Sequence, residues 1–133
     1  MHEPIPPQVE ELAKQVVDAA LAIHRALGPG LLESVYETCL AYELAKRKIP
    51  FRQQVRVPIV YDGNMLDADL RIDLLVGDCL IVELKVVELD NPLYMAQLLT
   101  YLKLTGHRLG LLINFNVPLI KNGIQRVVRP ATP

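Results

Sequence analysis

Hydrophobic residues recur every three or four positions in the first third of the chain, a spacing that predicts two amphipathic helices. The first helix is expected to begin near Val9 and to end before Gly28-Pro29-Gly30. The second is expected over residues 31–48, with an inner side formed by Leu32, Val35, Tyr36, Cys39, Leu40 and Leu44. Because a Pro-rich stretch precedes the first helix, we expect a flexible tail over residues 1–8 and a single domain over residues 9–133.

The pattern changes after the second helix, where apolar residues become dense enough to predict strands. Three such stretches cover residues 51–61, 66–76 and 79–87. They are separated by Asp62-Gly63-Asn64 and by Gly77-Asp78, and both segments suit tight hairpin turns. We therefore expect an antiparallel meander of three strands.

A third helix and two further strands complete the pattern. The helix is expected over residues 92–105, opened by Pro92, capped by Asp90 or Asn91 and closed by Gly106. Residues 109–115 form a continuous apolar run, which indicates a strand buried on both faces, and residues 125–129 add an edge strand. The predicted order is α-α-β-β-β-α-β-β, an α+β fold built as an α/β sandwich.

One predicted strand carries two charges inside an otherwise apolar run. Glu83 and Lys85 lie on the same face of this strand, about 7 Å apart, because side chains alternate along a strand. Isolated charges are costly in such a setting unless a partner or a metal compensates them. Asp73 lies at a similar distance before the Gly77-Asp78 turn, so the hairpin is expected to bring it beside Glu83.

This pair of carboxylates predicts a magnesium site. Two hard oxygen ligands, with water and substrate phosphate in the other positions, are what Mg²⁺ usually takes in proteins. Lys85 points the same way, so it is a candidate for stabilising charge on a phosphate or for helping to deprotonate an attacking water. The alternative interpretation is a structural ion pair between Glu83 and Lys85, with Asp73 merely flanking the turn.

Two helices add further candidates. Glu33 lies within about 20° of Leu40 and Leu44 around the second helix, which places this carboxylate on the interior side. Tyr94, Gln97 and Tyr101 share one face of the third helix. An aromatic stripe that packs on the core, with a capping Gln, is the alternative interpretation of that face.

Charge is segregated along the chain, although the net charge of −1 argues against a nucleic-acid binder. The net charge is −5 over residues 1–43, +5 over 44–56, −6 over 57–90 and +5 over 91–133. The acidic segment holds the candidate cation site, and the basic segments supply candidates for phosphate contacts: Arg52, Gln54, Arg56, Lys121, Arg126 and Arg129. Solvated faces with chance clustering are the alternative interpretation.

The two cysteines, Cys39 and Cys79, lie in apolar runs without CxxC spacing, which is typical of buried thiols in a reducing compartment. The chain starts without a basic and then apolar leader pattern, and no eighteen apolar residues run together. We therefore expect a cytoplasmic protein.

The order of these motifs resembles a known group of enzymes. Asp73 followed by Glu83-Leu84-Lys85 on neighbouring strands resembles the Asp…(D/E)xK core of the PD-(D/E)xK nuclease superfamily. Gly30-Leu31-Leu32-Glu33-Ser34-Val35-Tyr36 resembles the segment that gives the GxxExxY proteins their name, and two later segments resemble that family as well: Gln97-Leu98-Leu99-Thr100-Tyr101 and Gly110-Leu111-Leu112-Ile113-Asn114-Phe115. Ile72 stands where the superfamily's nominal Pro would be, a substitution that the superfamily tolerates.

The resemblance implies a mixed sheet flanked by helices and a role for each matched residue. Asp73, Glu83 and the Leu84 carbonyl would bind Mg²⁺, with Mn²⁺ as a substitute, and Lys85 would be the catalytic base or an electrostatic stabiliser. Glu33 would orient water or reach a second ion. Gln97 would steady Lys85 or the metal-bound water, and the substrate would be contacted by Tyr101, Arg52 and Arg56.

These expectations together predict a Mg²⁺-dependent nuclease that hydrolyses nucleic-acid phosphodiesters, with DNA as the favoured substrate and a homodimer as the assembly. Two alternatives stay open at this point. One is a non-catalytic nucleic-acid or protein-interaction module that retains the fold. The other is a metal-free structural protein whose polar strand residues pair internally.

Overall fold

A computed structural model describes residues 3–130, apart from the side chain of Ala68. The chain order of its helices and strands follows the predicted one, with a short 3-10 helix added between the last two strands. The elements are α1 (Pro7–Leu27), α2 (Glu33–Lys46), β1 (Phe51–Tyr61), β2 (Asn64–Val76), β3 (Leu80–Lys85), α3 (Pro92–Thr105), β4 (Leu109–Asn114), η1 (Ile120–Gly123) and β5 (Ile124–Val128).

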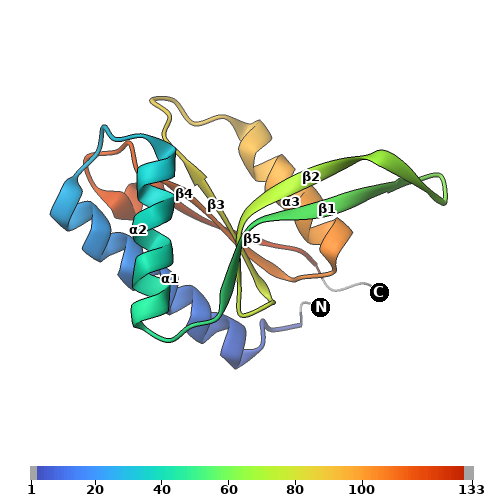
Figure 1. Cartoon of the computed structure of the whole chain (residues 1–133), viewed down its shortest axis with the longest axis horizontal. Coiled ribbons are helices and arrows are strands. Elements are labelled where there is room, and N and C mark those ends of the chain that lie inside the picture. The colour runs from blue at the N-terminus through green and yellow to red at the C-terminus, as the bar shows by residue number, and fades with distance from the viewer. Residues whose placement is uncertain (1–2, 131–133) are drawn as a thin grey trace.

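The strands form one mixed sheet in the order β1-β2-β3-β4-β5. Neighbouring strands are antiparallel except β3 and β4, which are parallel and are connected through α3. Helices α1 and α2 lie on one face of the sheet and α3 on the other (Figure 1). This arrangement confirms the predicted α+β fold, a mixed sheet flanked by helices.

Two layers of apolar side chains hold the helices on the sheet. On the α1 and α2 face, Tyr36, Leu40 and Leu44 pack with strand residues that include Val82 and Leu84. On the α3 face, Leu98, Tyr101 and Leu102 pack with Ile81 and Leu112, among others. The alternation along β3 therefore leaves Glu83 and Lys85 on the α3 face, as a two-residue period requires.

Several boundaries differ from the predicted ones. Helix α1 begins at Pro7, so residues 7 and 8 of the expected tail are helical, and Ile5 packs against the core. Proline suits this first helical turn because the turn needs no donor from its nitrogen. Residues 1 and 2 of the expected tail lie outside the described residues. Asn91, rather than Asp90, caps α3 by accepting a hydrogen bond from the Leu93 N–H.

The inner side of α2 is narrower than predicted. The helix begins at Glu33, two residues later than expected, and Leu32 is 74% exposed while Val35 is 38% exposed. Tyr36, Leu40 and Leu44 form the fully buried stripe, at the four-residue spacing of a single helix face. The turn at Gly30 leads directly into α2. The first residues of α2 therefore lie at the end of the sandwich, outside its core.

Strands β1 and β2 continue past the rest of the sheet as a two-stranded arm (Figure 1). Their pairing runs from Phe51↔Val76 to Tyr61↔Asn64, with a register shift between Pro58 and Val60. Proline removes a ladder donor, which is why such shifts occur beside it. Among the described residues, no helix is long and apolar enough to cross a membrane.

Candidate active site

The sheet opens between β2 and β3 at the position of the two predicted carboxylates. The strands pair from Val76↔Leu80 to Leu74↔Val82, and the next step would place Asp73 opposite Glu83. At this step, hydrogen bonds from backbone N–H groups to the two carboxyl groups take the place of the backbone–backbone bonds between the strands. The Leu84 N–H donates to Asp73 Oδ2 at 2.8 Å, and the Asp73 N–H donates to Glu83 Oε1 at 3.3 Å. The structure thus brings Asp73 and Glu83 together at the opening.

Glu83 is almost fully buried, with 5% of its surface exposed. Burial, followed by the neighbouring Asp73 charge and a hydrogen bond to Asp73, raises the pKa of its carboxyl to about 9. Without a cation, the Glu83 carboxyl therefore favours its protonated form near neutral pH. A bound cation would compensate the charges of both carboxylates, so Glu83 would then lose its proton.

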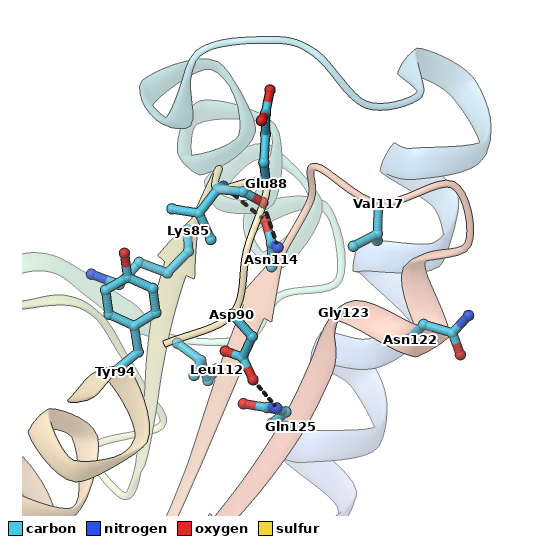
Figure 2. Close-up of a pocket in the computed structure, with 11 residues that line it drawn as sticks. Lys85, Glu88, Asp90, Tyr94, Leu112, Asn114, Val117, Asn122, Gly123 and Gln125 are labelled. Carbon is cyan, nitrogen blue, oxygen red and sulfur yellow. Dashed lines mark hydrogen bonds between the residues drawn. The ribbon is translucent and has the colours of Figure 1, made fainter. Parts of the chain in front are cut away.

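Lys85 lies on the same face of β3 as Glu83 and is held by an aromatic ring. Its Nζ lies 4.7 Å from the centre of the Tyr94 ring, a cation–π contact that joins β3 to α3 (Figure 2). The ammonium also lowers the pKa of the Glu83 carboxyl, although burial and Asp73 outweigh it. Lys85 is therefore positioned beside the carboxylate pair without being neutralised by it.

Tyr101 closes the α3 side of the site. Its ring is buried, and burial raises the pKa of its hydroxyl, with the charges of Glu83 and then Asp73 adding to the rise. The Tyr101 hydroxyl therefore lies within range of the carboxylate charges and stays protonated, so it remains a hydrogen-bond donor. Gln97 lies between Tyr94 and Tyr101 on the same helix but is exposed.

The N-terminus of α2 reaches the site from the other side of the sheet. Glu33 as a whole is exposed, which differs from the interior position expected for it, because it is the first residue of the helix. Desolvation of its carboxyl still raises the pKa, with the Asp73 charge as the next cause and Lys85 acting against it. The Glu33 carboxylate therefore interacts electrostatically with both Asp73 and Lys85. Within residues 3–130, however, no three side chains of His, Cys, Asp or Glu lie close enough together to hold a metal ion. The structure therefore presents a two-carboxylate centre with Glu33 at its edge.

Gln54, a predicted phosphate contact, connects α2 to this centre through Glu37, and the sequence interpretation missed both Glu37 and Gln53. Gln54 Nε2 donates to Glu37 Oε1 at 2.7 Å and reaches Asp73 Oδ1 at 3.5 Å. Gln53 Nε2 donates to the other oxygen of Glu37 at 2.9 Å. Gln54 has a φ of 51°, a left-handed conformation in the middle of β1, directly opposite Asp73. The spacing of Glu33 and Glu37, one helical turn apart, is the signal that could have indicated Glu37.

The loop before α2 is fixed by Tyr36, and this sets the position of Glu33. The Tyr36 hydroxyl donates to the Gly28 carbonyl at 2.6 Å and accepts from the Leu31 N–H at 3.2 Å. Its ring stacks on Phe115, just after β4, with the ring centres 4.3 Å apart. A buried aromatic thus ties the turn, the helix start and the sheet into one unit.

The arginines expected to contact substrate lie away from this centre. Arg52 pairs with Asp78 at the β2–β3 turn, and Arg56 pairs with Asp69 on the arm. Of the other predicted phosphate contacts, Arg126 pairs with Glu10, and Arg129 donates to backbone carbonyls near the end of α3. Ion pairs with neighbouring carboxylates therefore already engage most of these guanidinium groups.

The sheet, with Asp73, Glu83 and Lys85 placed where it opens, defines a nuclease-like α+β domain of the Asp…(D/E)xK type. The chain belongs to the PD-(D/E)XK nuclease superfamily, whose family model matches residues 10–127. A search of the curated proteins found no match to the chain.

Among solved structures, the chain is similar to one titled "Crystal structure of SSO0001", with a TM-score of 0.57 and 21% sequence identity. The similarity covers 94% of this chain and 60% of the other one. At this identity the likeness shows a shared fold, and the chain spans less than two thirds of that protein.

Proposed function

We propose that this protein is a Mg²⁺-dependent nuclease that hydrolyses nucleic-acid phosphodiesters, with DNA as the favoured substrate. The observation that carries the proposal is the Asp73–Glu83 pair at the strand opening, with Lys85 beside it. A buried Glu83 beside a half-buried Asp73 is costly for stability, and such arrangements with a neighbouring lysine are typical of functional sites.

The donor set fits a hard dication. Asp73 and Glu83 supply carboxylate oxygens, and the Leu84 carbonyl is the third proposed ligand. The Leu84 N–H points towards Asp73, and the Lys85 carbonyl accepts from Phe115 on the opposite, β4 side. Since the N–H and C=O of one strand residue point to the same edge, the Leu84 carbonyl also faces the opening. Carboxylate and carbonyl oxygens are the ligands that Mg²⁺ prefers, and Mn²⁺ accepts the same set.

When bound, Mg²⁺ polarises the scissile phosphate and lowers the pKa of a coordinated water. The protein's own groups supply the remaining functions. The Lys85 ammonium stabilises negative charge on the phosphate or helps to take a proton from the water, and the Tyr94 ring limits the positions that it can reach. Glu33 accepts a hydrogen bond from the attacking water, and Tyr101 donates its hydroxyl towards the carboxylates or the substrate.

A cleavage assay tests this proposal directly. Labelled single- and double-stranded DNA and RNA are incubated with the protein and Mg²⁺ or Mn²⁺, with EDTA as the blank. We expect cleavage that requires the metal and that falls by at least about 100-fold in Asp73→Asn, Glu83→Gln and Lys85→Met. Lys103→Met is the matched control, because Lys103 is exposed in the last turn of α3. Uncut substrates under all conditions, or equal cleavage by all variants, would refute the nuclease proposal.

Two expectations about the protein's setting stay predictions. We expect a homodimer, because a domain of this size encloses only part of a duplex, and light scattering after size exclusion measures the mass. We also expect a cytoplasmic location, on the basis of the free cysteines Cys39 and Cys79.

A further inference from the structure

A pocket beside Lys85 lies outside the carboxylate pair, since neither Asp73 nor Glu83 lines it (Figure 2). Its floor is the α3 face of the sheet at Leu112 and Gln125, and its walls include Tyr94, Asp90 and Asn114. It has a volume of 190 Å³. A single water needs about 10–15 Å³ by this kind of measure, so the pocket has room for a much larger group.

The walls of this pocket are fixed by hydrogen bonds and close packing. The Asn114 side chain bonds both backbone polar groups of Val87, at 3.2 Å to its N–H and 2.9 Å to its C=O. On the opposite rim, a Cβ added at Gly123 would lie 2.1 Å from the Asn114 carbonyl oxygen. Only glycine allows this approach of η1 to β4, so the pocket is a built part of the fold.

One buried polar atom on the pocket floor has no partner. Gln125 Nε2 donates to Asp90 Oδ2 at 3.1 Å, whereas Gln125 Oε1 is buried without a hydrogen bond among the described residues. The amide cannot be reversed, because its carbonyl would then face the Asp90 carboxylate. An unsatisfied buried acceptor is destabilising, and a ligand with a matching donor would offset that cost.

The charges around the pocket decide which ligand fits. The acceptor oxygens of Gln125 and Asp90 favour a group with N–H donors, and the carboxylates of Asp90 and Glu88, which both line the pocket, disfavour an anion inside it. Lys85 lies at the side shared with the carboxylate pair and is the position for a phosphate. Leu112 and Val117 add apolar surface suited to a flat ring. A ligand with an amino-bearing ring and an attached phosphate satisfies all of these groups.

We propose that this pocket binds the base of the nucleotide next to the scissile phosphate and selects a base with an exocyclic amine. Adenine, cytosine and guanine each carry such a donor, whereas thymine and uracil present carbonyl oxygens in its place. Those oxygens would face Gln125 Oε1 and the Asp90 carboxylate. The inference rests on the proposed nuclease function for its substrate, and it adds a base preference to that function.

Binding of mononucleotides tests the pocket separately from cleavage. Calorimetric titrations of the full chain in EDTA use dAMP, dCMP, dGMP and TMP. We expect the three amino bases to bind about 10-fold more tightly than TMP. Gln125→Met keeps the side-chain volume but removes one of the two acceptors, so it should reduce the preference for the amino bases over TMP, and an unchanged preference would contradict the role of Gln125. Gln8→Met, the same change at an exposed position of α1, should leave the preference intact.

Mapping of amide NMR shifts on the wild type keeps the test decisive if Gln125→Met does not fold. We expect dGMP to shift the signals of Asn114, Asn122 and Gln125, and not those of α1. Equal binding of the four nucleotides, or shifts confined to Lys85 and its neighbours, would overturn the proposal. Base-selective binding without any cleavage would refute the nuclease and keep the pocket. Cleavage without any base preference would refute the base pocket and keep the nuclease proposal.

Discussion

At the residue scale, the site is governed by the cost of burying Glu83 next to Asp73. The sequence predicted this neighbourhood, because the Gly77-Asp78 turn sets the register of β2 and β3. It named Gln54 only as a phosphate contact and could not predict its left-handed backbone or its bonds to Glu37 and Asp73, which arise only when α2, β1 and β2 are assembled. Nor could it predict the ion pairs of Arg52 and Arg56. Their partners, Asp78 and Asp69, come beside them only when the β2–β3 turn and the β1–β2 register have formed.

Glu83→Gln should stabilise the metal-free protein while it removes the cation site. The unfolded carboxyl ionises near its ordinary pKa of 4.5, but the folded one near 9, so at pH 7 folding requires Glu83 to take up a proton. The cost is at most about 3.5 kcal/mol at pH 7, from about 1.4 kcal/mol per unit between the unfolded pKa and pH 7. Glutamine is neutral and can donate to Asp73 as the protonated acid does. Urea unfolding in EDTA measures the gain.

The same shift gives the metal-free protein a pH dependence of defined sign. Because the folded pKa of Glu83 is raised, its contribution to stability is complete below pH 4.5 and is lost as pH rises towards 9. The difference between wild type and Glu83→Gln isolates this group from the other carboxyls. We expect that difference to grow with pH by at most about 1.4 kcal/mol per unit. A difference that is constant from pH 5 to 8 would show that the folded carboxyl is already ionised.

At the element scale, α3 lies on the sheet because β4 carries no side chain at Gly110. A Cβ added there would lie 2.8 Å from Leu98 Cδ1, and Leu98 is fully buried. Gly110→Ala should therefore lower stability by about 1–3 kcal/mol through overpacking. Leu98→Ala in the same chain makes room for the new methyl group. Thermal unfolding of both single variants and the double variant should show costs that do not add, and strict additivity would contradict the contact.

The start of α2 is the second element that positions the site. Tyr36→Phe keeps the stacking on Phe115 but removes the bonds to the Gly28 carbonyl and the Leu31 N–H. We expect a loss of about 1–2 kcal/mol in unfolding free energy, because two backbone groups lose their partner in partly buried hydrogen bonds. If Glu33 orients water, the cleavage rate should fall as well. Tyr42→Phe, at an exposed position of the same helix, is the matched control.

The sequence pattern predicted these elements better than it predicted their ends. Periodicity located each helix and strand, since it reports which side faces the core. Leu32 and Val35 are exposed although their types suggested burial, because the late start of α2 leaves them at the end of the sandwich. Hydrophobic character indicates what can be buried, and the packing of the whole chain decides what is.

At the scale of the whole molecule, the fold places charged residues where the sheet divides. Strands β1 and β2 leave the sheet as an arm. Asp73, Glu83 and the Leu84 backbone lie together at the opening between β2 and β3. Lys85 and Tyr94 separate that opening from the pocket at Gln125. A catalytic centre and a base pocket on one face of the sheet would together explain why two buried polar groups, the Glu83 carboxyl and Gln125 Oε1, persist in a small core.

The central claim is that Asp73 and Glu83 together capture a hard dication, and titration calorimetry with Mn²⁺ at pH 7.5 measures it most directly. We predict one binding event in the wild type, with release of about one proton because Glu83 must ionise. Asp73→Asn and Glu83→Gln should each abolish the event, whereas Lys103→Met should preserve it. Identical isotherms for wild type and both carboxylate variants, or no binding in the wild type, would contradict the claim.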